Sequence, residues 1–423
     1  MKPVDLFLMD MTNFGNTSGV DRYLEVLIKG LQRVPSVRLH RIQLIEGGDR
    51  LFVRRVRLPE GGVFVQIPLP RCLSEILTKS FWTRKYNEQV YRLIHDLFEG
   101  KERIIFHLHT LNLIDLACYV RERVPTCRII THLHCIPWKA LYNTDRPSFN
   151  RLYEVYYVQR GIPREKEPYL RLESEWNAYH RADRVVCVTD CAREFLGRLM
   201  GRKQGVHVIP NGMGDEDTMP AMRGYAGKPG ELRCLYVGVV SQSKGIQYIL
   251  EAMRKVTRRG YRVSLVACGT CSAARKKQLL AQYADVSVEL TGLVPYETLC
   301  SYYTSCDVGV IASLQEQSSY VAIEMMRFGM PVITTAVDGL DEMFRDGVDS
   351  LKVKAPFSTA FGLSVDTDAM AEYMIRLLER PEERGRLGRN AYERYREQFT
   401  LQRMIRETMA VYDEVWNENE QSK

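Results

Sequence analysis

Short β-branched or aliphatic runs alternate with longer amphipathic stretches along most of this chain. A strand is predicted at Val4–Met9 with a helix at 20–31, and the pattern restarts with a strand at Leu232–Val240 and a helix at 245–258. Strands that alternate with helices are typical of doubly wound α/β domains with parallel sheets. Further strands are predicted at 103–106, 128–130, 185–188, 206–209, 261–267, 286–290, 308–312 and 332–334, and further helices at 191–199, 273–282, 296–303 and 320–328.

The chain has 423 residues, which is more than one core comfortably holds and favours two domains of about 200 residues each. Residues 212–230 are rich in Gly, Pro, Asp and Met, so the linker is expected around 205–230. We therefore predict a first domain at 1–205, a second at 206–395 and a C-terminal helix at 396–423. Residues 401–416 place their apolar side chains on one helical face, and the first domain is one surface on which that face can pack.

Several classes of protein are disfavoured by composition. No apolar run approaches the roughly 18 residues of a membrane helix, and Asp5 and Asp10 interrupt what a signal peptide would need as its apolar core. The cysteines are scattered, which favours reduced thiols in a cytoplasmic protein. The pair Cys268 and Cys271 lacks a second ligand pair nearby, so neither a metal nor a redox role is expected there.

The net charge of +7 comes from residues 1–200, whereas residues 201–423 are nearly neutral. An anionic acceptor or the inner face of an anionic membrane would suit this basic half, and a solvated surface explains it equally well. No nucleic-acid partner is expected. The segment Ser74–Phe98 mixes basic and aromatic side chains, so it predicts either peripheral membrane contact or, as we favour, a helix with a buried aromatic face.

Two glutamates, Glu316 and Glu324, follow the predicted strand Val308–Ala312. A strand that leads into a helix offers free backbone N–H groups and a positive dipole end, which attract phosphate. Glu324 lies one turn into that helix and is suited to bind ribose hydroxyls, while Glu316, in the loop, is suited to hold a sugar ring. The alternative is one glutamate placed for the helix dipole and a second, unrelated one on the surface.

With the trailing Gly-Met-Pro-Val-Ile-Thr at 329–334, this segment resembles the retaining, nucleotide-sugar-dependent glycosyltransferases of family 4. The resemblance is densest over 206–355. It implies a GT-B fold, in which two Rossmann-like domains face a cleft, with the acceptor bound by 1–205 and the donor by 206–395. It also implies donor contacts at Ser318, Ser319 and Tyr320, although the family prefers Gly-aromatic-Gly where this chain has Gln-Ser-Ser at 317–319.

A second match is the loop after the strand at 232–240, where Gly238 and Lys244 correspond to the family's diphosphate-binding loop. The resemblance implies that Lys244 contacts the donor diphosphate, whose charge grows as the anomeric bond breaks. The family usually also has an arginine where Val239 stands, which puts a two-cation clamp in doubt. A lysine on the surface without a ligand is the alternative.

Smaller matches extend the resemblance. Leu293 lies in a loop whose backbone meets the nucleotide base in the family, and Gly339 with Glu342 resembles the family's Gly-Gly-x-x-Glu turn, with Asp338 in place of the first glycine. Residues 209–212 resemble the turn that opens the donor domain, and residues 182–189 resemble the last strand of the first domain.

In the first half, Gly15 and Gly19 stand between a strand and a helix, in the position of the family's loop that approaches the diphosphate or the acceptor. Glycine suits a close approach of backbone to ligand, though a flexible turn is the equal alternative. Arg22, early in that helix, is an anion-contact candidate.

Four histidines occur as two pairs, His107 with His109 and His132 with His134, each at the end of a predicted strand. A metal site is one interpretation, but no carboxylate or cysteine constellation completes it, so no metal is expected. His134 best matches a family histidine that faces the sugar or phosphate, and His109 can be a packed strand-end residue.

The resemblance therefore implies a retaining, metal-independent glycosyltransferase without a cofactor. Its predicted catalytic residues are Glu316, Lys244 and His134. The expected acceptor is a glycan or lipid-linked glycan, with a peptide left open. The alternatives are a nucleotide-sugar epimerase or hydrolase with the same fold, and a non-catalytic protein that binds nucleotide sugars.

Overall fold

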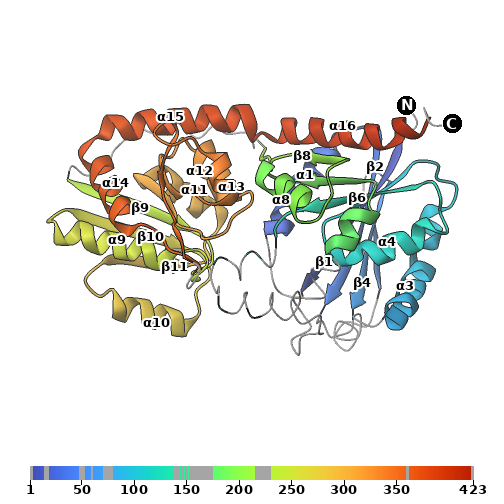
Figure 1. Ribbon diagram of the computed structural model, residues 1–423, viewed down its shortest axis with the longest axis horizontal. Coiled ribbons are helices and arrows are strands. Elements are labelled where there is room, and N and C mark those ends of the chain that lie inside the picture. Colours follow the sequence, from blue (N-terminus) through green and yellow to red (C-terminus); the bar gives the residue numbers. More distant parts are fainter. Residues whose placement is uncertain are drawn as a thin grey trace. The chain divides into compact units, whose positions relative to one another are not determined.

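The structure is a computed structural model of the chain, shown in Figure 1. It describes residues 3–13, 19–46, 53–58, 61–69, 80–136, 139, 143, 147, 151, 175–214, 230–358 and 362–420. The chain forms two compact units, the first comprising Met1–His134, Gly161–Pro210 and Leu401–Lys423, and the second comprising Cys135–Arg160 and Asn211–Thr400.

The first unit is built on an eight-stranded sheet with the strand order β3-β4-β2-β1-β5-β6-β7-β8. All paired strands are parallel except the edge strand β3, which runs antiparallel to β4. The strands are β1 (Val4–Asn13), β2 (Val37–Glu46), β3 (Arg54–Arg57), β4 (Val63–Leu69), β5 (Ile104–Leu108), β6 (Cys127–Leu133), β7 (Arg184–Cys187) and β8 (Val206–Val208). All five residues of the central strand β5 are buried, as expected for a parallel strand covered on both faces.

Helices cover both faces of this sheet. The helical segments are α1 (Gly19–Leu31), α3 (Ser80–Ile94), η1 (His95–Phe98), η2 (Leu111–Leu113), α4 (Ile114–Arg121), α8 (Asp190–Arg198) and α16 (Leu401–Glu420). Side chains of α3, η1 and α4 join one face of the strands in an apolar core. On the other face, α16 packs against α1 at Gly30, where an added Cβ would lie 2.5 Å from the side chain of Ile405. The C-terminal helix therefore packs on the first unit, which was one of the options for its apolar face.

The second unit has a six-stranded parallel sheet with the order β11-β10-β9-β12-β13-β14. Its strands are β9 (Glu231–Val237), β10 (Arg262–Cys268), β11 (Ser287–Gly292), β12 (Val308–Ile311), β13 (Val332–Thr335) and β14 (Ser350–Val353). A short antiparallel pair, β15 (Phe357–Ser358) and β16 (Gly362–Leu363), lies outside this sheet. Because β9 has β10 on one side and β12 on the other, the strand order reverses between β9 and β12.

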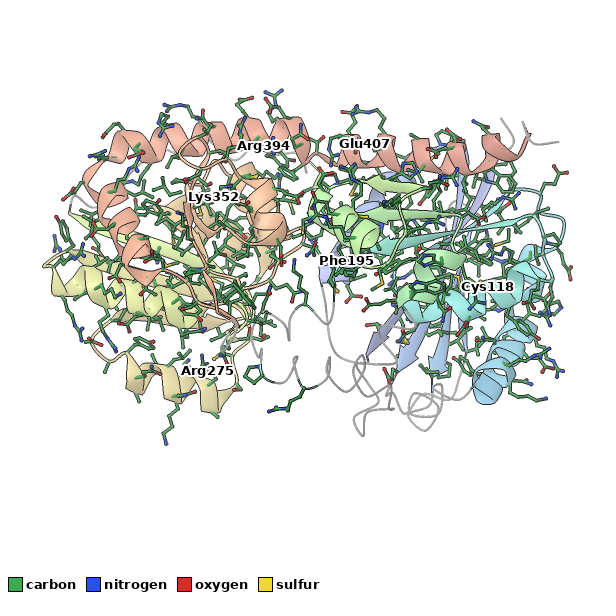
Figure 2. All side chains as sticks on the ribbon, viewed as in Figure 1. Cys118, Phe195, Arg275, Lys352, Arg394 and Glu407 are labelled. Carbon is green, nitrogen blue, oxygen red and sulfur yellow. The ribbon has the colours of Figure 1, made fainter. Side chains whose placement is uncertain are left out.

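Two apolar cores hold the second unit together, one on each face of its sheet, and side chains fill the space between sheet and helices (Figure 2). The helices are α9 (Ile246–Arg258), α10 (Ala273–Gln282), α11 (Tyr296–Ser305), α12 (Tyr320–Arg327), α13 (Asp338–Met343), α14 (Thr367–Glu379) and α15 (Pro381–Gln398). One core contains residues of α9, α10 and α14, and the other contains residues of α11, α12, α13 and α15. This is the doubly wound α/β arrangement that the alternating pattern predicted.

The predicted elements within the described residues are present, with shifts at their ends. The strand predicted to run to Val240 ends at Val237, and the helix predicted from Gly245 begins one residue later. Both differences come from glycines with positive φ, 143° at Gly238 and 73° at Gly245, which end the strand and precede the helix. Within the segment 74–98, residues 80–94 form the helix α3, and residues 74–79 lie outside the described residues. In the described part of the chain no helix is long and apolar enough to cross a membrane.

Candidate functional site

The loops at the carboxyl ends of β9 and β12 meet where the strand order of the second sheet reverses. Ligands of open α/β sheets bind outside the carboxyl ends of the strands at such a switch point. The amide of Leu314 donates to the carbonyl of Ser243 (2.8 Å), which joins the two loops directly. At Gly245 the loops approach so closely that an added Cβ would lie 1.9 Å from the carbonyl oxygen of Ala312.

An ion pair also joins the loops that follow β9 and β12. Lys244 Nζ lies 2.5 Å from Glu316 Oε2, although 72 residues separate them in sequence. The Ser313 hydroxyl also donates to Glu316 Oε2 (3.5 Å), and the Glu316 carbonyl accepts from the Gly339 amide (2.9 Å). The Glu316 side chain is 17% exposed and that of Lys244 37%. The structure thus brings together the two residues that the sequence assigned separately to sugar and to diphosphate.

The N-terminus of α12 faces the same edge of the sheet. Ser319 is the N-cap of this helix, and its hydroxyl accepts from the Ala322 amide (3.3 Å), so this side chain already has a structural role. The Ser318 hydroxyl is buried and has no hydrogen-bond partner among the described residues. Asn211 holds this turn by donating from Nδ2 to the Ser318 carbonyl (3.2 Å). Of the two serines, Ser318 is therefore the one whose hydroxyl has no hydrogen bond within the described residues.

Glu324 lies one turn into α12, as predicted, and its side chain is almost buried. The Tyr303 hydroxyl of α11 donates to Glu324 Oε2 (2.6 Å). Burial, reinforced by the Glu324 carboxylate, raises the pKa of Tyr303 well above its usual value and that of Tyr296 to about 12. Both phenols therefore remain protonated at neutral pH, and the Tyr303 hydroxyl orients the carboxylate of Glu324.

Two apolar side chains are exposed on the loops of this edge. Val239, after β9, is 55% exposed, and Leu293, after β11, is 78% exposed. The Val239 carbonyl accepts from the Tyr236 hydroxyl (2.7 Å), which fixes the loop that also carries Gly238. Leu293 therefore lies on a loop at the ligand-binding edge, and Val239 contributes no cation to it.

Two family models together account for most of the chain. One, described as "Glycosyl transferases group 1", matches residues 222–394, and the other, "Glycosyltransferase Family 4", matches residues 17–216. The chain belongs to glycosyltransferase family 4.

Curated relatives of this family 4 chain include an alpha-D-kanosaminyltransferase from Streptomyces kanamyceticus, 27% identical over 57% of this chain and 63% of that protein. A D-inositol 3-phosphate glycosyltransferase from Saccharomonospora viridis is 28% identical over 59% of each. The matched part therefore spans less than two thirds of these relatives' length. A sucrose-phosphate synthase from Thermosynechococcus elongatus has the same GT-B fold, with a TM-score of 0.74 and 20% identity over 98% of this chain and 99% of that one.

An ion pair and hydrogen bonds that the sequence did not reveal hold the loop that carries Glu316 in this family 4 chain. Asp338 has a φ of +43°, where family members usually have glycine, and its carboxylate forms an ion pair with Lys139. Burial raises the pKa of Asp338, and Lys139 counteracts this rise. Asn143 Nδ2 donates to the Leu314 carbonyl (2.9 Å), and Gln315 Nε2 donates to the Ile136 carbonyl (2.9 Å). Ile136, Lys139 and Asn143 thus hold the loop that carries Glu316, and the aspartate at a glycine position was the only sequence signal of these contacts.

The site residues predicted in the first half of the chain are Gly15, Gly19, Arg22 and His134. Gly15 lies outside the described residues, and an added Cβ at Gly19 would meet no described atom within 4 Å, so close packing does not require this glycine. Arg22 of α1 forms an ion pair with Glu25 (3.3 Å). His134 follows β6, and its Nε2 lies 3.0 Å from His109 Nδ1, which leaves Nδ1 of His134 as the nitrogen for a substrate contact.

Proposed function

We propose that this chain transfers a sugar from a nucleotide-sugar donor to an acceptor hydroxyl with retention of anomeric configuration. The observation that carries this proposal is the Lys244–Glu316 pair at the switch point of the second sheet. A cation and a carboxylate at that point suit a donor whose diphosphate is anionic and whose sugar offers hydroxyls. Family membership supports the reaction class.

In the proposed reaction the bond between the anomeric carbon and the diphosphate oxygen breaks, and the leaving diphosphate takes the electron pair. Lys244 and the N-terminus of α12 would stabilise the growing negative charge without a metal ion in this step. Glu316 would hold the sugar ring, and the acceptor would attack from the same face as the departing diphosphate. The diphosphate would accept the proton of the acceptor hydroxyl.

Neighbouring features suggest how the donor would be held. Glu324, oriented by Tyr303, would bind the ribose hydroxyls, and the Ser318 hydroxyl would bind a phosphate oxygen. Leu293 would contact the base. A structural neighbour from Anabaena, with a TM-score of 0.65 and 12% identity, was solved with UDP and glucose, so uridine diphosphate sugars are the first donors to test. The relatives' names do not agree on one acceptor, and we propose a glycan or lipid-linked glycan acceptor.

A thermal-shift screen with UDP-, GDP- and ADP-sugars is expected to raise the melting temperature with one nucleotide class. A ligand that binds only the native state stabilises it by about 2.7 kcal/mol at a hundredfold excess over Kd. The shift caused by the donor should be the same with and without EDTA, even if EDTA changes the melting temperature of the free protein. No shift with any of the three classes would contradict the donor site.

The Glu324→Ala variant is expected to weaken binding of the nucleotide about tenfold or more, because it removes the carboxylate assigned to the ribose. Tyr303→Phe keeps this carboxylate but removes the hydroxyl that orients it, so a smaller loss is expected. Isothermal titration with the nucleotide found in the screen measures both losses. Equal affinity of Glu324→Ala and the wild type would remove Glu324 from the proposed site.

A non-catalytic protein that binds nucleotide sugars is the second candidate. The exposed Val239 favours it, since no cation stands at the position where the family usually has an arginine. Incubation of the protein with the donor and a panel of glycans distinguishes the candidates. A transferred sugar supports the transferase, whereas binding of the donor with neither transfer nor hydrolysis supports the second candidate.

A further inference from the structure

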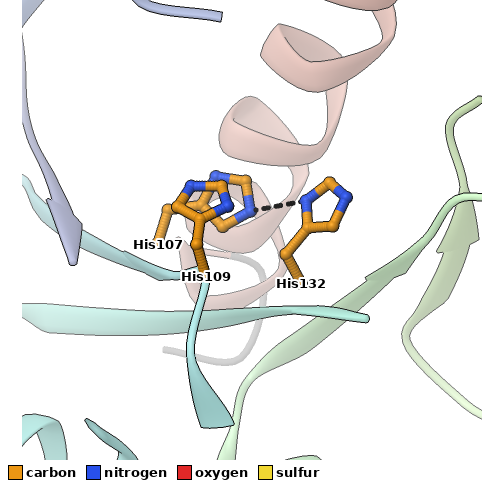
Figure 3. Close-up of side chains that lie close together, drawn as sticks. All are labelled: His107, His109 and His132. Atoms are coloured by element: carbon orange, nitrogen blue, oxygen red, sulfur yellow. Dashed lines mark hydrogen bonds between the residues drawn. The ribbon is translucent and has the colours of Figure 1, made fainter. Parts of the chain in front are cut away.

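A cluster of histidines in the first unit is not used by the proposed transfer reaction. His107 and His109 lie at the end of β5, and His132 lies on the adjacent strand β6. The three imidazoles are buried, with exposures of 0%, 5% and 2%. One ring nitrogen from each lies within 4.8 Å of those of the other two. Figure 3 shows the rings of His107 and His109 one over the other, each with a nitrogen directed towards His132.

The register of the sheet explains why these residues meet. His107 pairs with Ile130 in the parallel ladder of β5 and β6, so residues two further along each strand, 109 and 132, lie on the same face. The His109 amide donates to the Met9 carbonyl (2.8 Å), which places His109 beside β1. The strand order of the first sheet reverses between β1 and β5, and ligands of such sheets bind at the carboxyl edge there.

Partners outside the three rings fix the orientation of two of them. The Tyr412 hydroxyl of α16 lies 2.8 Å from His107 Nδ1, which leaves Nε2 of His107 facing His132 Nδ1 at 3.2 Å. His109 Nδ1 lies 3.0 Å from His134 Nε2. Histidines that bind metal ions typically use their other ring nitrogen for such a hydrogen bond, which sets the tautomer and the ring orientation.

Two nitrogens of the cluster remain unsatisfied. Nε2 of His109 and Nε2 of His132 are buried and have no hydrogen-bond partner within the described ranges. A buried polar atom without a partner destabilises the folded protein, so such atoms point to a ligand or to a functional constraint. The orphaned Nε2 of His109 is an observation independent of the clustering itself, whereas His132 faces His107 through its other ring nitrogen, Nδ1.

We propose that His107, His109 and His132 bind a divalent transition-metal ion, and that zinc suits them best. Imidazole nitrogens are common zinc ligands, and three of them with a fourth position form a known tetrahedral set. Two nitrogens on one tetrahedral zinc are about 3.3 Å apart at the usual Zn–N distance of about 2.0–2.1 Å. The 3.2 Å between His107 Nε2 and His132 Nδ1 matches that spacing.

The surroundings of the cluster agree with this assignment. The Tyr23 hydroxyl of α1 lies 3.4 Å from His132 Nδ1, so an oxygen is also present beside the cluster. A metal here would join β5 and β6 beneath α1 and α16.

The full chain, stripped with a chelator and then equilibrated with ZnCl₂, tests the proposal. After gel filtration, elemental analysis is expected to give one zinc per chain for the wild type. A competition titration with a chromophoric chelator is expected to show at least hundredfold weaker binding for His109→Ala. The matched control is His95→Ala, which removes an exposed histidine of η1 in the same unit and should bind zinc like the wild type.

A second variant keeps the test valid if His109→Ala does not fold. Tyr412→Phe leaves all three imidazoles in place but removes the hydroxyl that orients His107, so about 10–100-fold weaker zinc binding is expected. The absorption spectrum of the cobalt-substituted protein then distinguishes nitrogen ligands from thiolate ligands. The variant Cys271→Ser is the control for binding at the Cys268–Cys271 pair. No stoichiometric zinc in the wild type, or equal affinity in all variants, would overturn the proposal and leave a neutral hydrogen-bonded cluster.

Discussion

Glu316→Gln is expected to reduce kcat at least tenfold while the nucleoside diphosphate product binds as tightly as to the wild type, or more tightly. The neutral amide can no longer hold the sugar as a carboxylate does, and a tenfold loss corresponds to about 1.4 kcal/mol of transition-state stabilisation. The same change releases the Lys244 ammonium from its 2.5 Å ion pair and leaves it free for the diphosphate. Initial rates with the identified donor and acceptor, and titration with the diphosphate, measure the two effects separately.

Lys244→Ala should differ from Glu316→Gln in its affinity for the diphosphate. Removal of the ammonium is expected to lower kcat at least tenfold and also to weaken binding of the diphosphate. Asp368→Asn is the matched control, because it breaks another lysine–carboxylate pair of the same unit. In that pair Lys255, in the last turn of α9, lies 2.7 Å from Asp368, in the first turn of α14. If Asp368→Asn lowered kcat as much as Glu316→Gln, the effect would be one of general stability. Normal turnover in both Lys244→Ala and Glu316→Gln would show that the site is assigned wrongly.

The second unit could largely be predicted from sequence because its signals are local. Its strands are short aliphatic runs such as Val308–Ile311, which is buried throughout, and glycines mark the turns at the carboxyl ends of β9, β10 and β11. The helix that follows each strand then fixes the face and the edge on which a ligand binds. Glu316 and Lys244 could be placed on loops at this edge for this reason, and the family resemblance implied their roles. Their direct pairing could not be predicted, since it depends on which strands become neighbours.

Part of the first unit was not predicted because its strands hold polar residues that only tertiary pairing explains. β2 carries Arg41 and Gln43, and both donate to the buried carboxylate of Asp10 on β1, at 2.7–2.9 Å. Such residues interrupt the apolar pattern that identifies a strand. Each polar group has its partner about thirty residues away, so no local window contains the signal.

Contacts between residues far apart in the sequence also produce the histidine cluster and the Lys139–Asp338 ion pair, which local sequence patterns do not show. The paired histidines were visible as alternating strand ends, but the proximity of His107, His109 and His132 depends on the alignment of β5 with β6. The Lys139–Asp338 pair joins residues 199 positions apart. The absence of a nearby carboxylate or cysteine argued against a metal, yet three imidazoles are themselves a sufficient ligand set.

Gly245→Ala is expected to destabilise the second unit much more than Gly347→Ala does, although the two glycines have nearly the same φ angle. Their φ angles are +73° and +70°, so each substitution carries the same conformational cost of about 1–2 kcal/mol. An added Cβ at Gly347 meets no described atom within 4 Å, whereas at Gly245 it lies 1.9 Å from the Ala312 carbonyl oxygen. Displacing that backbone adds roughly 1–3 kcal/mol.

The comparison separates the strain of a left-handed residue from the close approach of the β9 and β12 loops at the switch point. Hydrogen exchange is expected to rise in β9 and β12 for Gly245→Ala and to stay near the wild-type rate there for Gly347→Ala. Because the Leu314–Ser243 hydrogen bond and the Lys244–Glu316 pair join these same loops, Gly245→Ala should also weaken donor binding. Equal exchange rates and equal donor affinities in the two variants would show that the loops yield easily, and that their contact does not hold Lys244 and Glu316 in place.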